Sequence, residues 1–166
     1  MTDDIQQGPN FMVQRIFLID ASLEVPLGSK IFTKEWKPEM NMDLSTKASA
    51  LDEKTHEVVL TVTVTVKIGE DVAFLVEVHQ AGIFVADSFP KDQLGPLLGS
   101  YCPNMLYAFA REAVTNLVVK AGFPQLYLTP VNFDALYEQH LQEQTGDQKS
   151  KNSKNSKTEA VADADS

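Results

Sequence analysis

Residues 57–68 carry the pattern that most constrains the fold of this chain. They read EVVLTVTVTVKI, with apolar side chains at every second position and threonines between them over most of the run. A β-strand has a period of two, so the aliphatic side chains lie on one face and the threonines on the other. A Gly-Glu-Asp turn at residues 69–71 leads into a second alternating run, residues 72–84. Together the two runs predict an antiparallel hairpin.

Two earlier segments alternate in the same way. In residues 14–25 one face is apolar and the other carries Asp20, Ser22 and Glu24; in residues 38–46, methionines and a leucine alternate with acidic residues and asparagine. The predicted inward residues are Phe17, Ile19, Ala21, Leu23, Val25, Met40, Met42 and Leu44. Four strands with one apolar face each require an antiparallel sheet that is covered on one side.

Residues 101–137 predict the cover. Apolar residues recur at three- and four-residue spacing from Leu106 to Val118, which is typical of an amphipathic helix. Gly122 predicts the helix end, and Asn132 is a suitable N-cap for a second helix. The sequence therefore predicts an α+β fold, in which a four-stranded antiparallel sheet is covered on one face by two helices.

Composition divides the chain into three parts and limits its partners. We expect a disordered arm at residues 1–10, one domain at 11–144 and a disordered polar tail at 145–166. The formal net charge of −9 argues against nucleic-acid binding and favours basic partners. The sequence contains no run long enough to span a membrane and no secretory signal at its N-terminus. Because Cys102 is the only cysteine, we expect a cytoplasmic protein.

No pattern of catalytic or metal-binding residues is present. The chain contains no phosphate-binding glycine motif and no Cys/His cluster with metal-ligand spacing, so we expect no cofactor, no metal and no enzymatic activity. We interpret His56, His79 and His140 as ordinary histidines. The thiol of Cys102, beside a proline at a helix start, is interpreted as an unreactive, partly buried group, although a helix N-terminus can stabilise a thiolate.

The acidic side of the sheet allows two interpretations. Asp20, Glu24 and Glu77 share one solvated face, where they could either serve as carboxylates for acid–base chemistry or discourage aggregation. Leu75 lies in the middle of this face. An apolar residue ringed by charges is typical of a small docking surface that steers an oppositely charged partner.

Several motifs together resemble one family. They are Tyr-Cys-Pro-Asn at 101–104, Ala-Arg-Glu at 110–112, Phe-Pro-Gln-Leu at 123–126 and Pro-Val-Asn-Phe-Asp-Ala-Leu-Tyr at 130–137. At this spacing the chain resembles the SecB family of export chaperones over about residues 11–144. The resemblance implies an ATP-independent holdase that keeps preproteins unfolded and delivers them to the motor ATPase SecA. It also implies a homotetramer, a dimer of dimers with the long helices at the dimer–dimer contact.

The resemblance assigns roles to three groups of residues. The SecA-docking residues would be Asp20, Glu24, Leu75 and Glu77, facing a basic, zinc-holding segment of SecA. The groove for unfolded clients would involve Trp36, Met40, Met42, Phe109, Phe123, Leu126 and Tyr127, although the alternation also places the methionines in the core. The residues supporting assembly would be Val76, Val78 and Gln80.

Two other functions stay open from the sequence. One is a chaperone of the same fold that serves a single partner, such as an antitoxin. The other is a small enzyme using Asp20, Glu24 and Glu77, which the lack of any pocket motif disfavours.

Overall fold

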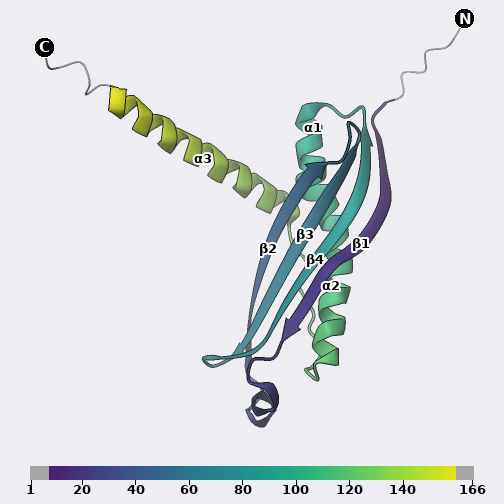
Figure 1. The fold of residues 1–166 in the computed structure, drawn as a ribbon, viewed down its shortest axis with the longest axis vertical. Coiled ribbons are helices and arrows are strands. Elements are labelled where there is room, and N and C mark those ends of the chain that lie inside the picture. Colours follow the sequence, from purple (N-terminus) through teal and green to yellow (C-terminus); the bar gives the residue numbers. More distant parts are fainter. Residues whose placement is uncertain (1–7, 160–166) are drawn as a thin grey trace, which may run out of the picture.

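The computed structural model describes residues 8–159 of the chain. Four antiparallel strands form one sheet in the order β1–β4–β3–β2 (Figure 1). The strands are β1 at Asn10–Glu24, β2 at Pro38–Ala50, β3 at Thr55–Ile68 and β4 at Asp71–Asp87. The helices are α1 at Lys91–Pro96, α2 at Cys102–Lys120 and α3 at Phe133–Glu159, with a π-helical turn at Leu97–Tyr101.

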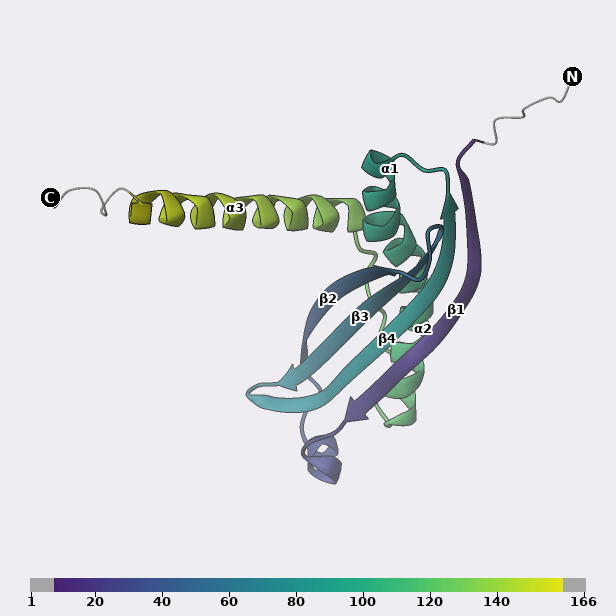
Figure 2. The same ribbon diagram turned by 45° about the horizontal axis from the view of Figure 1, so that its top comes forward.

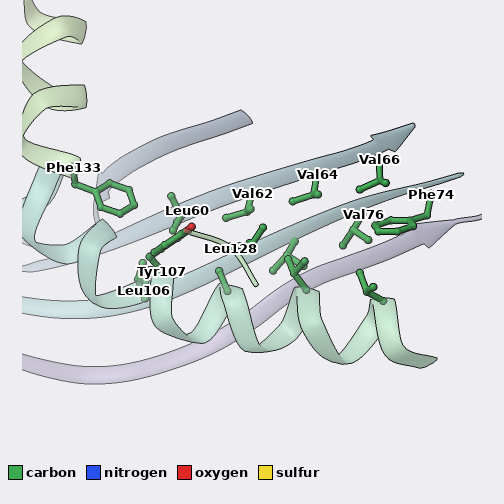
Figure 3. Close-up of a cluster of buried hydrophobic side chains, with 14 of the residues drawn as sticks. Leu60, Val62, Val64, Val66, Phe74, Val76, Leu106, Tyr107, Leu128 and Phe133 are labelled. Carbon is green, nitrogen blue, oxygen red and sulfur yellow. The ribbon is translucent and has the colours of Figure 1, made fainter. Parts of the chain in front are cut away.

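The core lies between the sheet and α2. Every second residue of β3 from Val58 to Val66 is fully buried, as the alternation predicted. The facing residues of β4 and the inner face of α2 complete the cluster, as Figure 3 shows. Full burial of one such side chain stabilises a fold by about 1.5–3 kcal/mol. The buried cluster includes Leu60, Val62, Val64, Val66, Phe74, Val76, Leu106, Tyr107, Leu128 and Phe133.

The predicted α+β fold is confirmed, but the two helices contribute unequally to the cover. Helix α2 lies along the sheet, whereas α3 leads away from it (Figure 2). Only the start of α3 joins the core, where Phe133 packs edge-on against Tyr107 with 5.6 Å between ring centroids. The extended segment between the helices, residues 121–132, supplies the rest of the cover through Phe123 and Leu128. We call it the connecting segment.

The helix ends follow the local sequence signals. Gly122 has a φ of 89° directly after α2, a conformation that residues with a Cβ rarely adopt. Asn132 caps α3, since its side-chain Oδ1 accepts a hydrogen bond from the amide of Ala135 at 3.1 Å. Both signals were read correctly from the sequence.

The register of β1 differs from the prediction. Irregularities between Val13 and Arg15 and between Leu18 and Asp20 insert extra residues opposite β4. Such a bulge reverses which side chains face the core. Phe17 therefore pairs with Ala81 on the outer face, and Ile19, predicted to point inward, is 51% exposed. Ile16 and Leu18, which interrupt the alternation in the sequence, pair with Gly82 and Gln80 on the core side instead.

The described secondary structure extends into both segments that were predicted to be disordered. Strand β1 begins at Asn10, and α3 continues to Glu159, past the position where a disordered tail was expected to start. The predicted tail at residues 145–166 lacks large apolar residues to bury, and its disorder stays a prediction. Residues 1–7 and 160–166 lie outside the described residues. The domain boundary at residue 144 stays a prediction.

Candidate functional site

The four predicted docking residues lie together on the face of the sheet that α2 leaves uncovered. Three alternate pairs of the β1–β4 ladder bring them onto one face: Glu24 opposite Leu75, Ser22 opposite Glu77, and Asp20 opposite His79. Asp20 and Glu24 are exposed, whereas Leu75 and Glu77 are half-buried. We call Asp20, Glu24, Leu75 and Glu77 the acidic face.

The centre of the acidic face is hydrogen-bonded. His79 Nε2 lies 2.6 Å from Glu77 Oε1, and His79 Nδ1 lies 3.1 Å from the hydroxyl of Thr61 on β3. The hydroxyl of Thr63 also reaches Glu77, at 3.5 Å from Oε2. His79, interpreted from the sequence as an ordinary histidine, therefore contacts a predicted docking residue. Its outward position beside Glu77 on the same strand is the sequence signal that links the two.

The predicted client residues do not form one patch. Trp36 and Phe123 do come together, with ring centroids 5.6 Å apart. The Phe32 ring stacks on Phe123 with 4.9 Å between centroids, and the Phe74 ring is tilted against Phe123 at 4.7 Å. Phe74 and Phe123 are buried, whereas Phe32 and Trp36 are 53% and 40% exposed. We call these four residues the aromatic cluster.

Phe32 was missed among the candidate client residues. It belongs to the crossover connection between β1 and β2, residues 25–37, which also carries Trp36. A short 3₁₀ helix at Gly28–Thr33 brings Phe32 over Gly122, and an ion pair between Lys34 and Asp71 joins the connection to the β3–β4 turn. The apolar residues of this long connection are the sequence signal for client binding, and from that signal only Trp36 was predicted as a client residue.

The connecting segment is fastened to α2 by side chains spaced four residues apart. The Tyr107 hydroxyl donates to the carbonyl of Thr129 at 2.6 Å, and Thr115 donates to that of Leu126 at 3.0 Å. Between them Arg111 reaches the carbonyl of Leu128 at 3.4 Å. These bonds fix an extended backbone that has no strand beside it.

The fastened segment presents its side chains alternately. Leu128 is buried, Leu126 is half-buried and Tyr127 is 77% exposed. On β2, an edge strand, Met42 is half-buried and its sulfur lies 3.7 Å from the Tyr107 hydroxyl. Met40 faces the core side but is 43% exposed, so the expectation that both methionines are core residues holds only in part.

Phe109 lies apart from the other client candidates. It is 44% exposed on α2, although helical spacing suggested a core position. It lines a groove between α2 and β1 with Leu18, Glu112 and Asn116. This groove and the aromatic cluster share no lining residue.

The predicted assembly residues are inside the protomer. Val76 and Val78 are completely buried beneath α2. Gln80 is 5% exposed, and its side-chain Nε2 donates to the backbone carbonyl of Phe17 at 3.0 Å. Their role in assembly stays a prediction.

The groups considered for chemistry are not assembled into a reactive site. Burial raises the pKa of the Cys102 thiol to about 12, which disfavours a thiolate. His56 is buried, and its Nδ1 has no hydrogen-bond partner among the described residues. Within residues 8–146 no set of His, Cys, Asp and Glu side chains is grouped to hold a metal ion. None of the helices in the described part of the chain is long and apolar enough to cross a membrane.

Comparison with known proteins gives consistent matches. A family model described as "Preprotein translocase subunit SecB" matches residues 4–144. "Protein-export protein SecB" of Thioalkalivibrio sulfidiphilus is 55% identical over 149 residues, covering 85% of this chain and 89% of the relative. The protein of the same name from Nitrosococcus oceani is 54% identical over 144 residues, covering 86% and 88%.

A solved structure supports the same architecture. The SecB-like chaperone of Mycobacterium tuberculosis, solved in complex with a peptide from an antitoxin, aligns with a TM-score of 0.59. The alignment covers 73% of this chain and 90% of that chain at 15% sequence identity. At this identity the similarity concerns the fold.

Proposed function

The chain belongs to the SecB family of protein-export chaperones, and on that premise we propose how it holds its clients and passes them on. As an export chaperone it keeps preproteins unfolded. Binding an unfolded chain removes it from folding and aggregation by mass action, which requires no ATP. The observation that carries the proposal is a set of large apolar side chains left exposed on firmly held backbone.

The aromatic cluster is the proposed centre of client binding. Phe74 and Phe123 form a buried base, on which Phe32 and Trp36 stay open to solvent. Flat aromatic rings offer large contact areas to apolar side chains of any shape. An unfolded chain presents such side chains, whereas a folded protein has buried them. This difference would select unfolded clients without reading a sequence.

The connecting segment and the edge of β2 extend the proposed client surface. Tyr127, Leu126, Met40 and Met42 offer apolar contacts, and methionine adapts to varied partners. The hydrogen bonds from α2 hold the segment in an extended form before a client arrives. Less ordering entropy is then lost on binding. Several weak contacts along one client chain would add up to useful affinity.

The acidic face is the proposed docking site for SecA. Glu24 lies opposite Leu75, Glu77 follows on the same face of β4, and Asp20 lies at the far end, so a basic segment would be steered by charge and anchored by a small apolar contact. The face lies on the opposite side of the sheet from α2. Client and motor could therefore be bound at once.

We propose a homotetramer, a dimer of dimers. Strand β1 is an edge strand with exposed Leu18 and Ile19, and α2 exposes Phe109 and Val119. Exposed apolar groups at a strand edge and along a helix favour contacts between copies. We further propose that the protein works in the cytoplasm, where the single buried thiol suits a reducing compartment.

The dedicated-partner alternative is the less favoured one. The solved chaperone bound to an antitoxin peptide is 15% identical to this chain, whereas the curated export proteins are 54–55% identical. An enzyme using the carboxylates of the acidic face is disfavoured as well. Glu77 is engaged by His79 and Thr63, and the face is open rather than enclosed.

The docking proposal predicts a separation of two activities. Glu77→Lys reverses one charge at the centre of the acidic face and should weaken SecA binding at least about ten-fold, because like charges at an interface are costly. Binding of an unfolded client should change less than about two-fold. The two affinities are measured by titration calorimetry with purified SecA and with a slow-folding preprotein.

Glu57→Lys is the matched control. Glu57 lies on the same face of β3, six residues along from Thr63, the residue opposite Glu77. At about 3.3 Å per residue the two sites are farther apart than the screening length of about 8–10 Å at physiological salt. Equal loss of SecA and client binding in Glu77→Lys, or equal loss of SecA binding in both variants, would contradict the proposal.

A further inference from the structure

His79 lies at one end of the acidic face, next to Glu77 along an inner strand of the sheet. Strand β4 presents it between Asp20 of β1 and Thr61 of β3, its partners in the two flanking ladders. Its side chain is 29% exposed and that of Glu77 is 44% exposed. The ring contacts Glu77 at 2.6 Å and Thr61 at 3.1 Å, so both ring nitrogens have a partner.

These contacts define which nitrogen carries the proton in the neutral ring. The Thr61 hydroxyl can donate to Nδ1, which leaves the ring proton on Nε2, where it is donated to Glu77 Oε1. Thr63 donates to the other carboxylate oxygen at 3.5 Å. Glu77 is thereby held at both oxygens, although nearly half of its side chain is exposed to solvent. A free glutamate would lose side-chain entropy when a partner docked.

We propose that His79 is a positioning residue of the acidic face, holding the Glu77 carboxylate in place when neutral and offsetting its charge when protonated. The inference rests on the proposed docking of a basic partner at this face. It adds a second requirement to that function. Docking depends on the charge state of one histidine as well as on the carboxylates.

The charged groups around His79 determine the sign of the effect. Strand β1 contributes Asp20 and β4 contributes Glu77, whereas β3 contributes the uncharged Thr61 and Thr63. On β2, Asp43 and Lys47 lie two residues to either side of Ser45, the partner of Thr61, and their opposite charges offset each other. Helix α2 packs on the opposite face. An imidazolium among these carboxylates makes the face less negative. A basic partner is then attracted less, so docking should weaken as the pH falls.

The test compares His79→Gln and His79→Leu with the full-length wild type. Glutamine has an amide that can still donate to Glu77 but does not titrate, whereas leucine removes the donor and keeps the apolar volume. Affinity for purified SecA is measured between about pH 6 and 8, across which a histidine changes charge. His140→Gln, on the exposed face of α3, is the matched control.

Wild type and the His140→Gln variant should lose about two- to five-fold more affinity between pH 8 and pH 6 than His79→Gln. At pH 8, His79→Gln should bind like the wild type, and His79→Leu should bind about two- to five-fold more weakly. Affinity of His79→Leu equal to wild type at pH 8 would overturn the positioning role. A wild-type pH dependence in His79→Gln would overturn the role of the histidine charge. If Glu77→Lys binds SecA normally, the acidic face itself is wrong. If Glu77→Lys loses affinity for SecA but the His79 variants bind and respond to pH like the wild type, the docking site is right and only the role of His79 is wrong.

Discussion

At the scale of single residues, Gln80 is bonded to β1 just before the strand departs from regular alternation. Its amide is buried among aliphatic side chains and needs a hydrogen-bond partner there. The backbone carbonyl of Phe17 provides it, just before the irregularity between Leu18 and Asp20. One polar side chain on β4 thus contacts the strand whose bulge turns Asp20 onto the acidic face. A buried amide in an apolar strand face was visible in the sequence, but its partner was not.

A second residue-scale consequence concerns the reactivity of Cys102. The thiol is fully buried, and burial raises its pKa to about 12. Because the thiolate is the reactive form, alkylation by iodoacetamide at pH 8 should be at least about 100-fold slower in the native protein than in urea. The reaction is followed by mass spectrometry. Equal rates in the native and unfolded protein would contradict the burial of this thiol.

At the scale of elements, the connecting segment depends on α2. It has no strand neighbour to satisfy its carbonyls, so Tyr107, Arg111 and Thr115 satisfy three of them from successive turns of the helix. The apolar content of the segment was evident from the sequence and predicted either burial or a partner. Both answers apply, since Leu128 is buried and Tyr127 is exposed.

Removal of one hydroxyl should reveal how much this fastening contributes. Tyr107→Phe leaves the carbonyl of Thr129 without its 2.6 Å bond and should lower the free energy of unfolding by about 1–2 kcal/mol. Tyr127→Phe is the control, because its hydroxyl contacts only the exposed Gln125 side chain and its loss should cost less than about 0.5 kcal/mol. Urea unfolding at one fixed protein concentration compares them. Equal losses in the two variants would show that the fastening is unimportant.

The sequence predicted the structure best where apolar residues recur at a regular spacing along one strand or helix. The period of two in β3 and β4 predicted their buried residues correctly, and the helix caps followed from Gly122 and Asn132. Contacts between elements distant in the sequence were harder to foresee. Phe32 stacks on a residue about ninety positions later, and no local pattern encodes that pairing. The sequence likewise does not show that α3 leads away from the sheet after Phe133, the residue of its first turn that packs in the core.

At the scale of the whole molecule, one sheet separates two proposed activities. One face is packed against α2 and ends at the aromatic cluster, whereas the other carries the acidic face. A small sheet with one covering helix buries limited apolar area by itself. Assembly of four copies would add buried surface at β1 and α2. It would also place several client surfaces on one particle, which raises the affinity for a long unfolded chain.

The most direct test of the account is the mass of the protein with and without clients. Size-exclusion chromatography with light scattering is run on the protein alone, with a denatured slow-folding preprotein, and with the same preprotein folded. We predict the mass of four chains for the protein alone and a gain in mass only with the unfolded client. A gain with the folded client as well, or no gain with the unfolded one, would contradict the holdase account. A single-chain mass would contradict the proposed assembly.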